Sequence, residues 1–302
     1  MARKDRSATE VPEQKQETIK QKLVAFFREA GIVLGLFLVI NNFVIASFLV
    51  PTGSMENEVL TGELLFVNKF IYGGTSPRNI PFTNVRLPYF QLPALRDVHR
   101  GDVIVFVWPG YREDIVPSEF QFYLKRCVAV SGDTLEIRNR ALYVNGRLSP
   151  LPRNIRIDDP NPKPSWYVED RMFPPGKSWN EDNYGPIVVP KKGMVIPLSP
   201  QNFREWEIFI GREGHQATLV GDEVLVDGIP VKDYTVRRDY LFGMGDHRDN
   251  SLDSRYWGFV PKESLVGTPM IVYWSWNTDI SLLDIFGRLG SIRWGRIGSL
   301  IR

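Results

Sequence analysis

An apolar stretch close to the N-terminus is the feature that most constrains the fold of this chain. Residues 31–50 read GIVLGLFLVINNFVIASFLV, and residues 30–55 contain no charged side chain. Twenty helical residues span about 30 Å, the thickness of the hydrocarbon core of a bilayer. A cleavable targeting peptide is the alternative, although its apolar part is usually shorter. The sequence therefore predicts one transmembrane helix over residues 30–50.

Basic residues flank this stretch unequally. Residues 11–30 carry four Lys and Arg side chains, whereas residues 51–70 carry one. Because basic residues are retained on the cytoplasmic side of a membrane, the N-terminus is predicted to lie in the cytoplasm. Residues 1–29 would then form a cytoplasmic tail, and residues 51–302 would form a domain on the outer side.

The chain after the apolar stretch has the pattern of an antiparallel β protein. Short runs rich in Val, Ile, Phe and Tyr alternate with Gly, Asn and Asp, as strands and turns do. These runs occupy residues 62–73, 101–108, 120–133, 134–146 and 217–228. Two of them end in YVNG and LVDG and predict hairpins of similar design. We predict a mainly β fold on a single helical anchor.

Two segments depart from the β pattern. Residues 148–200 are dense in proline and charge, which predicts an insertion or subdomain outside the core. Residues 275–302 interleave four arginines with aromatic and aliphatic residues. This tail either packs on the domain or forms a basic aromatic surface on anionic lipid, and the membrane anchor favours the lipid.

Composition excludes several classes of function. The net charge of +2 predicts no general attraction to nucleic acid. The single cysteine, Cys127, cannot form an intramolecular disulfide and lacks a context that would stabilise a thiolate. The chain has three histidines and no HExxH motif, and the acidic residues of 243–258 do not have EF-hand spacing. We therefore expect no metal and no cofactor.

A serine and a lysine are the candidate catalytic pair. Ser54 follows the apolar stretch in a glycine-containing turn, which by itself predicts only a polar turn. Lys125 lies in the run FYLKRCVAV, where strand alternation puts it on one face with Tyr123, Cys127 and Ala129. Burial on such a face lowers the pKa of a lysine, so its neutral amine can take the proton of a serine hydroxyl.

The run GMGDHRDNSLDSRYWG, residues 243–258, is the most distinctive polar segment of the chain. Asp253 and Arg255 can form an ion pair within it. Ser251 offers a neutral hydroxyl that could orient the lysine amine without restoring its charge. The segment therefore predicts a hydrogen-bonded network that supports the lysine.

In their order along the chain, these motifs resemble those of the bacterial type I signal peptidases. The resemblance rests on PTGSM at 51–55, GDVIVF at 101–106, YLKR at 123–126 and the loop at 245–258. It covers residues 48–268, with a poor match over 148–235. It implies a β-fold serine endopeptidase on the outer face of the bacterial inner membrane. Its partners would be the lipid bilayer and the signal peptides of exported proteins, cut at Ala-x-Ala sites.

The resemblance also implies catalytic roles for the matching residues. Ser54 would be the nucleophile and Lys125 the general base. The hydroxyl of Thr52 and the backbone N–H of Ser54 would form the oxyanion hole. Ser251 would orient Lys125.

The remaining matched residues would shape the site. Asp253 and Arg255 would give structural support. Shallow pockets for small substrate side chains would be lined by Phe48, Val50, Tyr123 and Leu124.

The chain departs from the family pattern next to the nucleophile. Residues 56–59 read ENEV where the family usually has x-Pro-Thr-Leu, and His247 stands where Asn is common. Two other functions stay open. One is a catalytically inactive, membrane-tethered interaction protein derived from a peptidase. The other is a Ser–Lys autoprotease, a class whose members carry a DNA-binding domain where this chain has an apolar helix.

Overall fold

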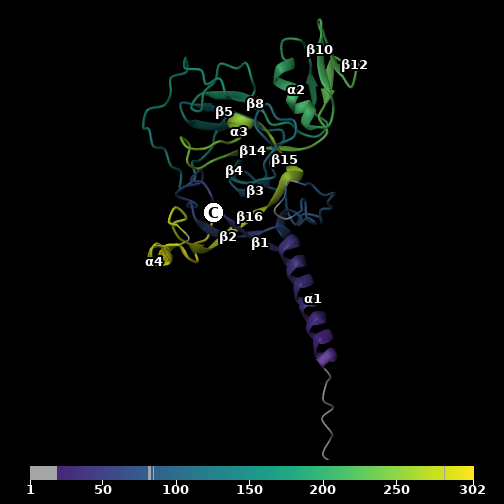
Figure 1. Ribbon diagram of the computed structural model, residues 1–302. Coiled ribbons are helices and arrows are strands. Elements are labelled where there is room, and N and C mark those ends of the chain that lie inside the picture. The colour runs from purple at the N-terminus through teal and green to yellow at the C-terminus, as the bar shows by residue number, and fades with distance from the viewer. Residues whose placement is uncertain (1–18, 81–82, 84, 282) are drawn as a thin grey trace, which may run out of the picture. The chain divides into compact units, whose positions relative to one another are not determined.

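The computed structural model describes residues 19–80, 83, 85–281 and 283–302. Its first element is a helix (Figure 1). Helix α1 (Ile19–Phe43) has 25 residues, none of them buried. By length and hydropathy it is the one helix in the described ranges that could cross a membrane. The chain divides into two compact units, residues 1–40 and residues 41–302.

The bounds of α1 differ from the predicted span of 30–50. The helix begins earlier because residues 19–29 contain no Gly or Pro and consist mainly of good helix formers. It ends at Phe43 because the next apolar residues form strand β1 (Ile45–Leu49), which pairs with β2 (Glu63–Asn68). Part of the apolar stretch therefore enters the sheet of the domain.

Seven antiparallel strands form the main sheet. In spatial order they are β1, β2, β16 (Leu265–Ser275), β3 (Val103–Val107), β4 (Phe122–Val130), β14 (Tyr240–Met244) and β15 (Val260–Pro261). Strands β3 and β14 are buried along almost their whole length, because their sequences VIVFV and YLFGM are apolar at nearly every position. The predicted mainly antiparallel β fold is confirmed.

Three smaller sheets and short helices complete the domain. The strands are β7 (Arg147–Leu148), β6 (Ala141–Val144), β5 (Thr134–Arg138) and β8 (Tyr184–Val188) in one sheet, β10 (Ala217–Val220), β11 (Glu223–Val226) and β12 (Ile229–Pro230) in another, and β9 (Val195–Pro197) with β13 (Asp233–Thr235). The helices are α2 (Phe203–Arg212), α3 (Ser254–Trp257), α4 (Ile285–Gly290) and the 3-10 turns η1 (Phe70–Tyr72), η2 (Lys262–Ser264) and η3 (Trp294–Arg296). In Figure 1, α2 and the β10–β12 sheet form one group.

The two hairpins of similar design form where YVNG and LVDG predict them. Asn145 and Gly146 have φ angles of 53° and 74°, and Asp227 and Gly228 have φ angles of 52° and 78°. Positive φ at both central residues is typical of type I′ turns, whose twist matches that of the flanking strands. The turns join β6 to β7 and β11 to β12.

Residues 148–200 contribute to the domain core, although their composition predicts a subdomain outside it. The largest cluster of buried apolar side chains includes Met172, Phe173, Tyr184 and Ile196. Strand β8, which carries Tyr184, pairs with β5. Strand pairing and apolar burial therefore bring this proline-rich segment into the core.

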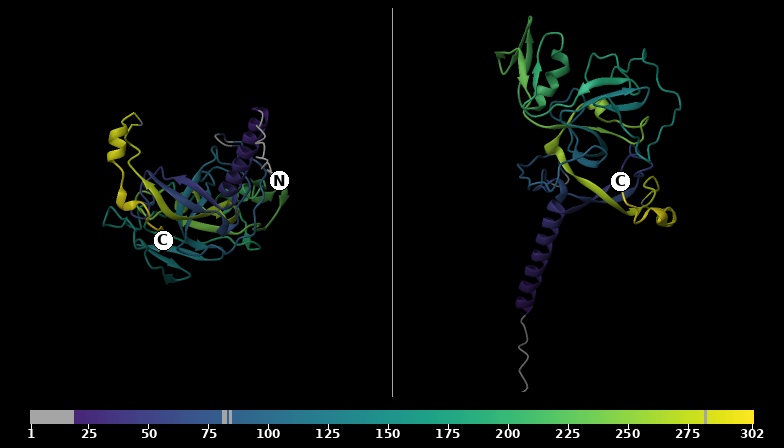
Figure 2. Two further views of the ribbon diagram at one scale, coloured as in Figure 1. Left: turned by 90° about the horizontal axis from the view of Figure 1, so that it is seen from below. Right: turned by 180° about the vertical axis from the view of Figure 1, so that it is seen from behind.

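Residues 275–302 leave the end of β16 and return to the main sheet. Figure 2 shows α4 projecting away, with the C-terminus lying back beside the domain. Arg293 Nη1 donates to the Thr61 carbonyl at 2.9 Å, and Arg296 Nε donates to the Glu63 carboxylate at 2.6 Å. These arginines bind the domain, so contact of the tail with lipid stays a prediction. Its most exposed apolar side chains are Leu283, Phe286 and Trp294.

Candidate functional site

Ser54 lies in the connection between β1 and β2. Backbone hydrogen bonds from Val50 N to Glu63 O and from Gly62 N to Val50 O, each 2.9 Å, close the base of this connection. Met55, next to Ser54, is fully buried among apolar side chains of the sheet. The turn is therefore fixed at its base and beside its serine, which holds a polar residue at a set place on the domain.

Lys125 lies in the middle of β4, between β3 and β14. Its side chain is only 2% exposed, and its Nζ atom donates a hydrogen bond to Ser54 Oγ at 2.6 Å. The Nζ atom also lies 5.6 Å from the centre of the Tyr123 ring. Cys127, two residues further along, is fully buried, as the apolar strand face predicts. The structure thus joins the two residues of the predicted catalytic pair.

Burial lowers the pKa of Lys125 to about 8. Desolvation of the ammonium group is the largest cause. The negative charge of Asp253 opposes it, the positive charge of Arg255 adds to it, and Asp246 opposes it less. A lysine with this pKa has a substantial neutral fraction near pH 8, whereas an ordinary lysine, with a pKa near 10.4, has very little. The site can therefore supply a base without a histidine.

The loop after β14 is held together by Asp253. Asp253 accepts a hydrogen bond from the Gly245 N–H at 3.1 Å and caps α3 by accepting from the Arg255 N–H at 3.1 Å. It also forms a buried ion pair with the Arg255 guanidinium, with both contacts at 2.9 Å. The predicted pairing of Asp253 with Arg255 is present, and it ties the start of the loop to its end.

Ser251 is next to the pair but is not joined to it. Its Oγ atom is buried and has no hydrogen-bond partner within the described part of the chain. A Cβ atom added at Gly245 would lie 2.2 Å from Ser251 Oγ and 2.5 Å from the Ser54 carbonyl oxygen. The loop therefore approaches the nucleophile turn so closely that only glycine fits. The orienting role of Ser251 stays a prediction.

Two hydrogen-bond donors of the nucleophile turn are available to a substrate. Among the residues that the structure describes, neither the Ser54 N–H nor the Thr52 hydroxyl has a hydrogen-bond partner. Thr52 is exposed, and both residues line the same cavity. This arrangement has the donors that an oxyanion hole requires.

All four predicted substrate-binding residues line a small cavity next to Ser54. Its volume is about 120 Å³, and Ser54 and Lys125 lie in its lining. Apolar side chains from β1, β2, β3, β4 and the residue after β1 form much of the wall. They include Phe48, Val50, Leu65, Val105, Tyr123 and Leu124.

The acidic residues after Ser54 point to partners other than Lys125. Glu56 pairs with Arg156 at 2.7 Å. Glu58 is buried and accepts hydrogen bonds from Asn154 Nδ2 and from the backbone N–H of Arg302, each at 2.6 Å. These three partners are far from the turn in sequence, so the sequence alone does not reveal them.

His247 is a part of the site whose role the sequence does not reveal. Its backbone N–H donates to the Ser54 carbonyl at 3.1 Å, and its Nε2 atom lies 2.6 Å from Asp158 Oδ2. Its Nδ1 atom lies 3.3 Å from the Gly53 carbonyl oxygen. The ring therefore contacts the nucleophile turn and not the Ser54 hydroxyl. No group of three or more His, Cys, Asp or Glu suited to a metal occurs among the described residues.

Comparisons with known proteins show which proteins this chain is similar to. A family model described as "Signal peptidase, peptidase S26" matches residues 23–274. The protein named signal peptidase I in Helicobacter pylori is 28% identical over 253 residues, which cover 80% of this chain and 78% of that protein. The protein of the same name in Pseudomonas aeruginosa is 28% identical over 287 residues, which cover 89% of this chain and 79% of that protein. A crystal structure of a signal peptidase I from Enterococcus faecalis V583 is 19% identical, with a TM-score of 0.26 over 58% of this chain and 98% of that one.

Proposed function

The chain belongs to the signal peptidase family, peptidase S26, and we propose that Ser54 and Lys125 are the catalytic dyad with which it removes signal peptides from exported proteins. The observation that carries the proposal is the 2.6 Å contact between Lys125 Nζ and Ser54 Oγ in a buried site. The lowered pKa of Lys125 supports the same assignment. A serine hydroxyl is a weak nucleophile until an adjacent base takes its proton.

The first half of the reaction forms an ester on Ser54. The neutral amine of Lys125 removes the hydroxyl proton, and Ser54 Oγ attacks the carbonyl carbon of the scissile peptide bond. The Ser54 N–H and the Thr52 hydroxyl donate to the oxyanion that forms, a type of interaction usually worth a few kcal/mol for each donor. The Lys125 ammonium then gives its proton to the leaving amine, and the peptide bond breaks.

The second half releases the signal peptide. Lys125 is neutral again and removes a proton from water, whose oxygen attacks the ester carbonyl. The tetrahedral intermediate collapses, and the lysine proton returns to Ser54 Oγ. Ser251 would accept a hydrogen bond from the Lys125 ammonium, and its buried hydroxyl, which has no partner among the described residues, supports this role. Asp253 and Arg255 hold the loop that carries Ser251.

The unequal flanking charges support a membrane orientation for this reaction. Residues 1–29 would lie in the cytoplasm, and α1 would cross the inner membrane of a bacterium. The catalytic domain, whose main sheet begins with β1, would then lie on the outer side, where signal peptides emerge. The bilayer and the signal peptide are the two partners that this reaction needs.

The proposed base predicts how activity depends on pH. The essential form of Lys125 is the neutral amine, so kcat/KM is expected to rise with pH through an apparent pKa of about 8. The measurement is a pH–rate profile of the full chain in detergent with a synthetic Ala-x-Ala precursor peptide. Glu56→Gln is the control, because Glu56 pairs with Arg156 near the surface, and it should move the profile by less than about 0.3 units. A profile that is flat between pH 6 and 9 would contradict a lysine base.

The size of the cavity predicts specificity. A volume of about 120 Å³ beside Ser54, walled by Phe48, Leu65 and Tyr123, suits small side chains. We expect peptides with Ala at the first and third positions before the cut to be cleaved at least about a hundredfold faster than those with Leu, because a closed pocket excludes large side chains by steric clash. The measurement is kcat/KM for a matched pair of Ala-x-Ala and Leu-x-Leu peptides. Equal values would refute the assignment of this cavity.

A further inference from the structure

A second, larger cavity borders β4, apart from the cavity that contains Ser54. Successive strand residues point to opposite faces, so Arg126 reaches this second cavity while Lys125 reaches Ser54. Its volume is about 1170 Å³. The lining is strongly basic, and within the described residues Glu58 is its only acidic side chain. The arginines that line it are Arg100, Arg126, Arg147, Arg153, Arg248 and Arg302.

Two of these arginines have anionic partners within the protein. Arg100 Nε donates to Asp133 at 2.7 Å, and Arg126 Nε donates to Asp246 at 2.8 Å. Arg153 lies in the same lining with an exposed side chain, where water can solvate its charge. The charges of these three arginines are therefore accounted for.

Arg248 is different because its side chain is mostly buried and forms no ion pair with the described residues. The residue is 7% exposed, and its Nε atom is buried with no hydrogen-bond partner in the described part of the chain. Its guanidinium forms no ion pair with any residue that the structure describes. The carboxylates that act on it electrostatically, Asp253 and Asp246, already pair with Arg255 and Arg126.

A buried, unpaired guanidinium is costly to the folded protein. Desolvation lowers the pKa of Arg248 to about 10, which shows how unfavourable its surroundings are for the charge. Proteins normally pair buried charges, because removal from water is not otherwise compensated. An anion in the cavity would supply the missing partner.

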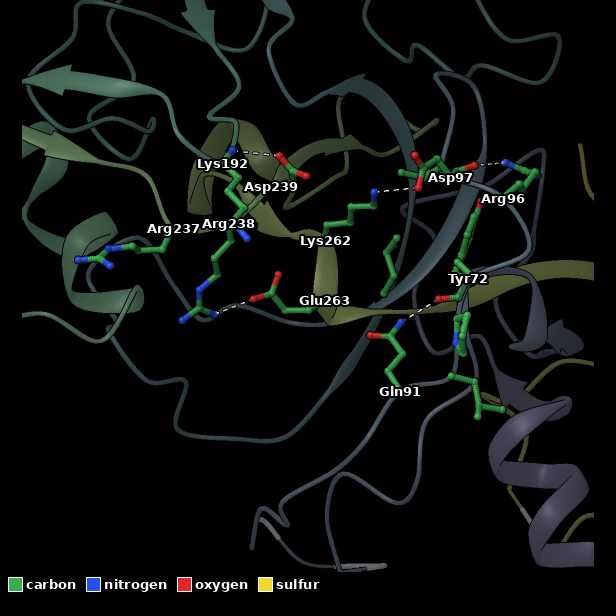
Figure 3. A pocket seen from close by; sticks show the side chains of 15 residues that line it. Tyr72, Gln91, Arg96, Asp97, Lys192, Arg237, Arg238, Asp239, Lys262 and Glu263 are labelled. Carbon is green, nitrogen blue, oxygen red and sulfur yellow. Dashed lines mark hydrogen bonds and ion pairs between the residues drawn. The ribbon is translucent and has the colours of Figure 1, made fainter.

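The cavity in Figure 3 shows that a basic lining alone does not require a ligand. That cavity has a volume of about 590 Å³ and also contains several cations. Its Lys262 pairs with Asp97 at 2.8 Å, and its Arg238 pairs with Glu263 at 3.2 Å. These cations are satisfied within the protein, whereas Arg248 is not.

We propose that the large cavity beside β4 binds a phosphate group, with Arg248 as the buried anchor and Arg153 as an exposed contact. A guanidinium fork matches the oxygens of phosphate in a bidentate geometry, and phosphate oxygens can accept from several arginines at once. The group could belong to an anionic phospholipid or to a soluble phosphate, which present the same chemistry to the cavity. The site does not depend on the proposed peptidase activity.

The test measures thermal unfolding of the full chain in neutral detergent, with sodium phosphate against sodium chloride at equal ionic strength. Phosphate at saturating concentration is expected to raise the Tm of the wild type by about 3 °C or more. Arg248→Gln should lose this shift. Arg238→Gln, from the cavity of Figure 3, should keep it. Phosphate also stabilises proteins generally, but that effect is common to all three chains.

The baseline of the variant gives a second readout. Without phosphate, Arg248→Gln should unfold at a temperature no lower than the wild type, because the substitution removes an uncompensated buried charge. If this variant does not fold, Arg153→Gln replaces it, since Arg153 is exposed, and should reduce the phosphate shift by at least half. The proposal is overturned if phosphate raises the Tm of the wild type no more than it raises the Tm of the Arg248 and Arg153 variants. It is also overturned if Arg238→Gln is the variant that loses the increase in Tm.

The source of the phosphate group is decided with lipid. The wild type is placed in bilayer discs of phosphatidylcholine with or without phosphatidylglycerol. If the lipid headgroup fills the cavity, phosphatidylglycerol will raise the Tm, soluble phosphate will add nothing further, and Arg248→Gln will abolish the gain. If soluble phosphate fills it, lipid composition will leave the phosphate shift unchanged. A gain from phosphatidylglycerol that survives in Arg248→Gln counts against the site.

Discussion

Replacing Ser54 with Ala, or Lys125 with Met, is expected to reduce kcat/KM by at least about a thousandfold. Each change removes one half of the nucleophile–base pair, and residues that act as such a unit cause losses of this size or more when either is removed. The assay is cleavage of a synthetic Ala-x-Ala precursor peptide by the detergent-solubilised full chain. The double variant should be no worse than either single one, because the first change already disables the pair.

Stability separates loss of chemistry from loss of fold. Lys125→Met should unfold at a temperature at least as high as the wild type at pH 7, because burial of the ammonium is unfavourable. The folded pKa of about 8 lies below the unfolded value, so the unfolded chain binds more protons between about pH 8 and 10. Wild-type stability should therefore rise with pH across that window, and this rise should be absent in the variant.

The same assay tests the competing functions. An inactive, tethered peptidase-like protein would cleave nothing, and an autoprotease would cleave its own chain but not the peptide. Replacing all three histidines with Ala should leave more than about one hundredth of the activity, since His247 contacts Gly53 and Asp158 and not Ser54 Oγ. A larger loss with a folded variant would point to a histidine base and exclude the Ser–Lys assignment.

Replacing Gly245 with Ala is expected to lower kcat by about a hundredfold. The added methyl group would lie 2.2 Å from Ser251 Oγ and 2.5 Å from the Ser54 carbonyl oxygen, distances that real Cβ contacts do not reach. Either the loop or the nucleophile turn must therefore shift. A displacement of about 1 Å in a catalytic group typically costs two orders of magnitude in rate.

Gly290→Ala is the matched control for this substitution. Gly290 lies in α4, and a Cβ added there meets no atom within 4 Å. This variant should retain wild-type kcat, KM and Tm. If Gly245→Ala stays within about threefold of wild-type kcat, the close approach of the loop does not position Ser54, and its part in the site must be withdrawn.

The pattern of the sequence alone predicts those features that depend on near neighbours in the chain. The length and hydropathy of residues 31–50 predict an apolar helix. Alternation in FYLKRCVAV predicts that Lys125 lies on an apolar face, and the structure confirms its burial. The motifs around Ser54 and at 245–258 identify the family, which the match over residues 23–274 confirms. Periodicity and motifs are local properties of the sequence, so they can be recognised without knowledge of how the chain packs.

Features that depend on pairing between distant segments were decided only by the tertiary structure. Helix α1 ends at Phe43 because the residues that follow pair as β1 with β2. An unbroken apolar run does not indicate where this change from helix to strand occurs. Asp158 reaches His247 across 89 residues, and Lys125 reaches Ser54 across 71. Arg248 likewise forms no ion pair among the described residues because the nearby carboxylates of Asp246 and Asp253 already pair with Arg126 and Arg255. Burial and strand register fix these distances, and both are properties of the whole fold and not of a local pattern.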